Sequence, residues 1–119
     1  MKILTIMCVL LIAVGYTGCY YDKSLLDQNA ICDTAIVTYS GSVKPVLTAY
    51  CLGCHSGPNA PLRVRLDNYT DVRSQVLNGK LLGSITHSPG FIPMPQGNKL
   101  SDCNIAKIRK WIVTGSPNN

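Results

Sequence analysis

Cys51-Leu52-Gly53-Cys54-His55 decides the fold of this chain, because these five residues read C-x-x-C-H. Two thiols at this spacing can add to the two vinyl groups of haem, while the imidazole of the next residue reaches the iron. In a helical continuation, residues three apart lie on the same side, so both thiols would face one porphyrin edge. We therefore expect one covalently bound haem c, with His55 as the proximal iron ligand.

Three other interpretations of the same spacing fit less well. A thioredoxin-like redox pair requires a βαβ pattern around the motif, and the flanking residues show none. A structural zinc site requires four ligands in paired spacing, but the sequence has no second C-x-x-C and no H-x3-5-H. A plain disulfide between Cys51 and Cys54 would leave His55 without a role. Haem attachment gives all three side chains a function.

The length of the chain favours one small domain, and its net charge favours binding to acidic partner proteins. The chain has 119 residues, which is enough for a single hydrophobic core. Charged residues make up 14% of the chain, and the formal net charge is +5 without runs of Lys or Arg. This modest positive charge suits an electron carrier that docks on acidic redox partner proteins, and it argues against a nucleic-acid-binding protein.

The N-terminus has the pattern of an export signal. An almost wholly apolar run from Ile3 to Val14 follows Lys2, and small residues then lead to Cys19. This pattern resembles a bacterial lipoprotein signal, in which residues 1–18 would be removed and Cys19 would be lipidated as the first mature residue. Tyr16 departs from the family pattern, which usually has an aliphatic residue three positions before the cysteine.

Two alternatives to a lipid anchor remain open. Cleavage after Gly15 would release a soluble periplasmic or secreted protein, since Ala13-Val14-Gly15 resembles an A-x-A site. The uncharged run from Ile3 to Tyr21 could instead remain as an N-terminal membrane anchor. All three possibilities place the domain outside the cytoplasm, where disulfides persist.

The remaining cysteines predict a disulfide. Of the six cysteines, Cys8 would leave with the signal, Cys19 would take lipid and two would hold haem, which leaves Cys32 and Cys103. A bridge that closes a loop of about 70 residues stabilises a domain by up to about 4 kcal/mol in the chain-entropy model. The alternative is a pair of buried free thiols.

Helical periodicity predicts an all-α domain over residues 39–119, preceded by a tether and N-terminal arm over residues 19–38. The first helix would be capped by Ser42, would tolerate Pro45 in its first turn, and would run into Cys51. Its apolar face would comprise Val43, Val46, Leu47 and Tyr50.

Two further helices follow, separated by a long loop. The second helix would begin at residues 68–70 and end at Asn78-Gly79. Residues 81–95 lack helical periodicity and contain several glycines and prolines, so they predict a loop. The last helix would be capped by Ser101 and end at Gly115. Its apolar face would comprise Ile105, Ile108, Trp111 and Ile112.

Two residues can complete the coordination of the iron. Met94 lies between Pro93 and Pro95, which restrict the backbone and present the thioether from a stiff loop. His87 is the alternative axial ligand, and it would lower the redox potential relative to a His/Met pair. Without that role, His87 would be a loop histidine or a hydrogen-bond donor near a haem propionate.

The order of these features resembles the class I cytochrome c family over residues 39–115. Residues 94–112 are similar to small bacterial cytochrome-c-like domains of exported lipoproteins. The resemblance implies that Cys51 and Cys54 bind haem and that His55 and Met94 are the axial ligands. It also implies that the first and last helices cross at the haem edge, which would bring Val46 and Tyr50 near Ile108 and Trp111.

We therefore expect an exported, lipid-anchored monohaem cytochrome that carries single electrons and is not an enzyme. Four cations could guide an acidic partner to the haem edge: Arg63, Arg65, Lys80 and Lys99. The first alternative is a haem-based gas binder or sensor in which Met94 is displaced. The second is an assembly or surface protein whose haem is mainly structural.

Overall fold

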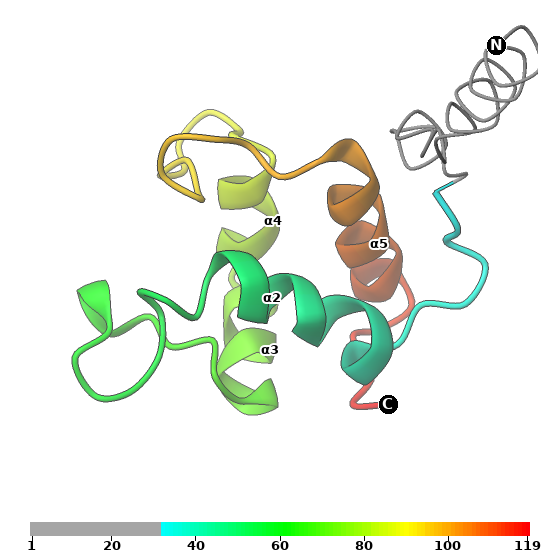
Figure 1. Ribbon diagram of the computed structural model, residues 1–119, viewed down its shortest axis with the longest axis horizontal. Coiled ribbons are helices and arrows are strands. Elements are labelled where there is room, and N and C mark those ends of the chain that lie inside the picture. The colour runs from blue at the N-terminus through cyan, green and yellow to red at the C-terminus, as the bar shows by residue number, and fades with distance from the viewer. Residues whose placement is uncertain (1–31) are drawn as a thin grey trace, which may run out of the picture. The chain divides into compact units, whose positions relative to one another are not determined.

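Helices form all the regular structure that the computed structural model describes, which covers residues 32–119 (Figure 1). This range contains no strand, and it confirms the all-α prediction. The order of elements is η2 (Tyr39–Val43), α2 (Lys44–Tyr50), η3 (Pro61–Arg63), α3 (Tyr69–Leu77), α4 (Lys80–Ile85) and α5 (Asp102–Val113).

The first helix begins earlier than the sequence predicted. Thr38, and not Ser42, provides the cap, because its hydroxyl accepts a hydrogen bond from the Gly41 amide at 3.0 Å. The π-helical turn η2 then continues directly into α2. The predicted apolar positions at residues 43, 46 and 47 are buried, but Tyr50 is 55% exposed. Tyr50 is the last residue of α2, and its side chain lies outside the core.

Helix α3 has the predicted bounds. The Asn68 side chain caps it by accepting a hydrogen bond from the Asp71 amide at 2.9 Å. Asn78 follows its last residue, and Gly79 adopts a left-handed conformation with φ 73°. Since an L side chain is disfavoured at this φ, glycine allows the chain to turn sharply into the next helix.

Helix α4 corrects the prediction that residues 81–95 are a loop throughout. It spans Lys80–Ile85, has no side-chain cap, and packs against α3 and α5. Leu81 and Ile85, four residues apart, are buried on its core side. A helix this short gains its stability from tertiary packing, so its own sequence shows too little periodicity to predict it.

Helix α5 agrees with the prediction at both ends. The Ser101 hydroxyl accepts from the Asn104 amide at 3.3 Å, and Gly115 beyond the helix has φ 94°. Ile108 and Trp111 are fully buried. This helix therefore supplies the largest side chain of the core.

Tyr39, rather than Tyr50, joins the first helical segment to the last. Its ring centroid lies 5.5 Å from that of Trp111 and 5.2 Å from that of Tyr69. The C-terminal residues close this cluster, since the Trp111 indole donates to the Pro117 carbonyl at 2.9 Å and the Tyr69 hydroxyl donates to the Ser116 carbonyl at 2.7 Å. The first helical segment thus contacts the last helix through η2.

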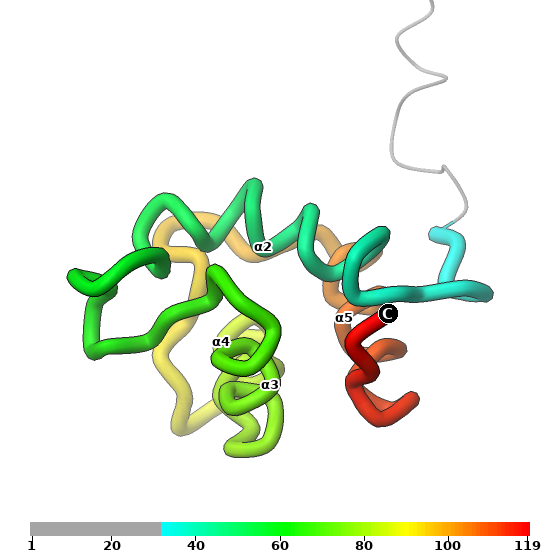
Figure 2. The backbone as a smooth tube through the Cα atoms, turned by 90° about the horizontal axis from the view of Figure 1, so that it is seen from below, coloured from blue at the N-terminus to red at the C-terminus, as the bar shows by residue number. Residues whose placement is uncertain are grey.

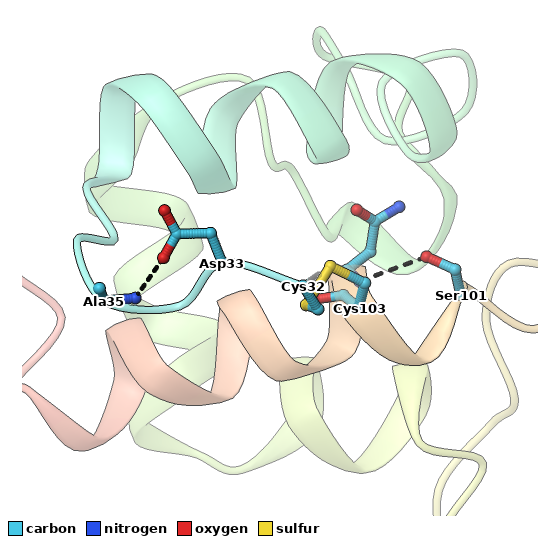
Figure 3. Close-up of a disulfide and its surroundings, with 6 residues drawn as sticks. Cys32, Asp33, Ala35, Ser101 and Cys103 are labelled. Carbon is cyan, nitrogen blue, oxygen red and sulfur yellow. Dashed lines mark hydrogen bonds between the residues drawn. A yellow bond between two sulfur atoms is a disulfide. The ribbon is translucent and has the colours of Figure 1, made fainter. Parts of the chain in front are cut away.

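Cys32 and Cys103 form a disulfide with a Cα–Cα distance of 5.4 Å (Figure 3). It ties the first described residue to the first turn of α5, beside the Ser101 cap. The predicted signal over residues 1–18, the alternative membrane anchor, and the lipidation site at Cys19 lie outside the described residues. Within residues 32–119, no helix has the length and apolarity needed to span a bilayer.

Candidate functional site

The C-x-x-C-H motif forms a turn at the C-terminal end of α2. Cys51 is the cap residue, with φ −123°, and its amide donates to the Leu47 carbonyl. The Cys51 carbonyl then accepts hydrogen bonds from the amides of Cys54 at 3.1 Å and His55 at 2.8 Å. These two bonds wrap the motif into a single turn that holds both cysteines and the histidine together.

The two motif cysteines are free thiols in different environments. Cys51 is half-buried, whereas Cys54 is exposed. Burial raises the pKa of Cys51 to about 11. A redox-active C-x-x-C pair functions with a lowered thiol pKa, because the thiolate is the nucleophile. The environment of Cys51 therefore opposes a thioredoxin-like role.

The imidazole of His55 is held by a backbone acceptor. Its Nδ1 atom lies 2.8 Å from the carbonyl oxygen of Val64. A carbonyl oxygen only accepts hydrogen bonds, so Nδ1 carries a proton, and in the neutral form of the ring the free lone pair is then on Nε2. Metal-ligating histidines typically show this arrangement, in which the second ring nitrogen donates to a carbonyl or carboxylate.

The loop over residues 56–67 returns to His55 and fixes this geometry. The Leu66 amide donates to the His55 carbonyl at 2.8 Å, two residues beyond the hydrogen-bonded Val64. Asp67 closes the loop by accepting from the Gly57 amide at 3.0 Å. That amide, with a smaller contribution from Arg65, holds the pKa of Asp67 below its ordinary value.

Arg65 takes part in the same loop. Its guanidinium lies 3.4 Å from an oxygen of Asp67 and 3.3 Å from an oxygen of Asp71. Arg65, one of the four cations predicted to guide a partner, thus already forms ion pairs with two carboxylates. Arg63, Lys80 and Lys99 are exposed and form no ion pair with residues 32–119.

The loop that contains Met94 and the segment that contains the motif follow two different helices, α4 and α2. In both views, the loop that follows α4 and the segment that follows α2 are at the end away from the C-terminus (Figures 1 and 2). Met94 is half-buried, and its amide donates to the Ser84 carbonyl at 3.1 Å. This bond fixes the methionine backbone to the last turn of α4.

His87 occupies the turn between α4 and Met94. Its backbone is left-handed, with φ 56°. Among the side-chain nitrogen and oxygen atoms of residues 32–119, its Nε2 is the one buried atom without a hydrogen-bond partner. The hydroxyls of Thr86 and Ser88 on either side pair with each other at 2.8 Å.

Within the described range, no group of three or more His, Cys, Asp or Glu side chains gathers in a way that could hold a metal ion. The zinc-site interpretation therefore has no ligand set there. Comparison with family models, curated proteins and solved structures finds no match for this chain.

Two features of the site could not be found from the sequence. The partner of His55 is the carbonyl of Val64, and the anchor of Met94 is the carbonyl of Ser84. Every residue has such a carbonyl, so neither acceptor leaves a signal in the sequence. Only the fold of the loops selects them.

Proposed function

We propose that this chain is an exported monohaem c-type cytochrome that carries single electrons between redox partner proteins. The observation that carries the proposal is the 2.8 Å contact between Nδ1 of His55 and the Val64 carbonyl, within a C-x-x-C-H turn. In the neutral form of the ring, this contact leaves the lone pair on Nε2, and it fixes the orientation of the imidazole, as a proximal ligand requires. When bound, haem supplies an iron that cycles between the ferric and ferrous states.

The residues of the motif fit covalent attachment of haem. Cys51 and Cys54 are free thiols on one turn, directly beside His55. Two thioether bonds would hold the porphyrin even though the domain is small.

Met94 is the proposed second axial ligand. The hydrogen bond from its amide to Ser84 holds the loop in place, so a thioether can be presented with little loss of conformational entropy. The exposed cations Arg63, Lys80 and Lys99 would raise the rate of encounter with an acidic redox partner. A His/Met pair that stays bound in both redox states supports electron transfer rather than gas binding.

Haem attachment can be tested in a host that exports the protein and matures c-type cytochromes. Acid-acetone extraction should leave colour on the protein, and a pyridine haemochrome assay should give one haem per chain. The double variant Cys51→Ser/Cys54→Ser should lose the colour. The matched control Cys32→Ser/Cys103→Ser also removes two cysteines, but it should retain the haem because this disulfide pair lies outside the motif. Full extraction of haem from the unaltered protein would contradict the proposal.

Electron transfer requires a second measurement. The haem-loaded protein should be reduced and reoxidised reversibly in a voltammetric experiment, and its ferrous form should take up carbon monoxide slowly at neutral pH. The weak far-red band of iron–sulfur ligation should be present in the ferric protein. Rapid uptake of carbon monoxide would favour the gas-binding alternative, since it would mean that Met94 dissociates readily.

A further inference from the structure

We propose that His87 is a second iron-ligating residue of this chain, which replaces Met94 when the thioether leaves the iron. This inference rests on the proposed function, because it assumes that the iron of a bound haem is held by His55. It goes further in assigning two ligand states to one protein. Three features of His87 support it: the backbone anchor that it shares with Met94, its buried side-chain nitrogen, and the turn that holds it.

The backbones of the two residues are fixed to the same atom. The Ser84 carbonyl accepts a hydrogen bond from the Met94 amide at 3.1 Å and another from the His87 amide at 3.2 Å. A carbonyl oxygen has two lone pairs, so it can accept both bonds at once. The end of α4 therefore brings two soft or borderline iron ligands, a thioether and an imidazole, to adjacent backbone positions.

The imidazole of His87 has a buried nitrogen that the protein does not satisfy. Nε2 is shielded from solvent and has no hydrogen-bond partner among residues 32–119. Leaving a buried polar atom without a partner costs about 1–3 kcal/mol. A role as a reserve metal ligand would explain this unpaired atom, because a metal ion would bind the lone pair of Nε2 directly.

The turn that holds His87 does not require an imidazole side chain at this position. Its φ of 56° is a conformation that glycine or asparagine adopts more easily at the end of a helix. The turn is already closed by the Ser88 amide, which donates to the Gly83 carbonyl at 2.9 Å, and by the paired hydroxyls of Thr86 and Ser88. The imidazole itself takes no part in these bonds.

The exchange is a simple ligand substitution. With haem bound, the bond between the iron and the Met94 sulfur would break, and a bond to Nε2 of His87 would form through the lone pair of this nitrogen. No electron or proton is transferred in this step. Because imidazole favours ferric iron more than a thioether does, the His87-ligated form would have a lower redox potential than the Met94-ligated form.

The test uses three variants of the haem-loaded exported protein: Met94→Ala, His87→Asn, and the double variant. Asparagine tolerates the left-handed backbone but cannot replace imidazole as an iron ligand, so it isolates the role of the ring. Spin state is read by ferric electron paramagnetic resonance and visible absorption. Met94→Ala should lose the far-red band but stay low-spin, with the signature of two imidazole ligands. His87→Asn should keep the Met-ligated spectrum of the unaltered protein.

The double variant decides the assignment. It should become high-spin, its ferrous form should bind carbon monoxide rapidly, and added imidazole should restore the low-spin state. A high-spin Met94→Ala single variant would overturn the inference, and so would a low-spin double variant, because another group would then be the ligand. If His87→Asn fails to fold, His87→Gly provides the same comparison without strain at a positive φ. Absence of covalent haem in the unaltered protein would instead contradict the proposed function.

Discussion

The aromatic ring of Phe91 lies directly against the backbone of Gly83, in the space that a side chain at position 83 would fill. Gly83 is on α4, and Phe91 is in the loop that leads to Met94. An added Cβ would clash with three carbon atoms of the ring. The absence of a side chain at this position therefore determines how closely the Met94 loop approaches the helix.

Replacing Gly83 by alanine should destabilise the protein by about 1–3 kcal/mol, the usual effect of overpacking. The new methyl group must displace Phe91, and it would strain the loop between α4 and Met94. Chemical denaturation followed by circular dichroism measures the loss. The far-red band of the haem-loaded protein should weaken as well, because the methionine would be held less firmly.

The Phe91→Ala background provides the control for this prediction. Without the ring, Gly83→Ala should be neutral or should stabilise by up to about 1 kcal/mol, since alanine is the better helix former. The coupling energy from the double-mutant cycle then isolates the contact between the two positions. An equal effect of Gly83→Ala in both backgrounds would contradict the packing argument.

The disulfide should contribute strongly to stability. Removing it in the double variant Cys32→Ser/Cys103→Ser should lower the free energy of unfolding by about 2–5 kcal/mol, because the unfolded chain regains the entropy of a long loop. The transition midpoint in urea measures this change. Peptide mapping without reduction should recover the cross-linked pair from the unaltered protein. Alkylation of Cys32 and Cys103 in the unreduced native protein would exclude the bridge.

Asp67 should make stability depend on pH in the acid range. Its folded pKa lies below the ordinary value, first because of the Gly57 amide and then because of Arg65. The stabilisation is therefore fully present above the ordinary pKa of aspartate, about 3.9, and is lost as the pH falls through the lower folded pKa. Asp67→Asn should lower the denaturation midpoint at pH 6, and this difference should vanish in strong acid.

Asp33→Asn is the control, since it removes the same charge from the N-terminal arm, away from the loop that returns to His55. Its effect on the denaturation midpoint should be small at both pH values. A difference between Asp67→Asn and the unaltered protein that persists in strong acid would show that the carboxylate charge is not the cause.

The parts of the fold that could be predicted are those with local chemical signals. Asn68 and Ser101 are side-chain caps, and Gly115 has the left-handed conformation expected beyond a helix. These signals act within a few residues, so a single sequence contains them. Helices α3 and α5 accordingly match the prediction.

The parts that could not be predicted depend on distant contacts. Helix α4 has no capping side chain and is held by packing against α3 and α5. Tyr39 joins the core through Trp111 and Tyr69, which lie far along the sequence. At the site, the sequence indicates His55 and Met94, but the carbonyls that orient them become known only when the loops are folded.

The final prediction concerns Cys19, which lies outside the described residues. The apolar run from Ile3 to Val14, followed by small residues and a cysteine, predicts that Cys19 is the mature N-terminus and carries lipid. Two or more acyl chains anchor a small domain stably, whereas one chain gives only marginal binding. Cys19→Ser should therefore move the protein from the membrane fraction to the soluble exported fraction, as followed by immunoblotting after fractionation.

The same fractionation separates the three possible fates of the N-terminus. If Cys19→Ser remains in the membrane after an alkaline carbonate wash, the uncharged run from Ile3 to Tyr21 is a spanning anchor. If the unaltered protein is already soluble, cleavage occurs before the cysteine, near Gly15. The control Cys32→Ser/Cys103→Ser should stay in the membrane, because these cysteines pair within the helical unit. Mass spectrometry of the N-terminal peptide should then show diacyl or triacyl modification on Cys19 itself, and an unmodified Cys19 would contradict the lipoprotein assignment.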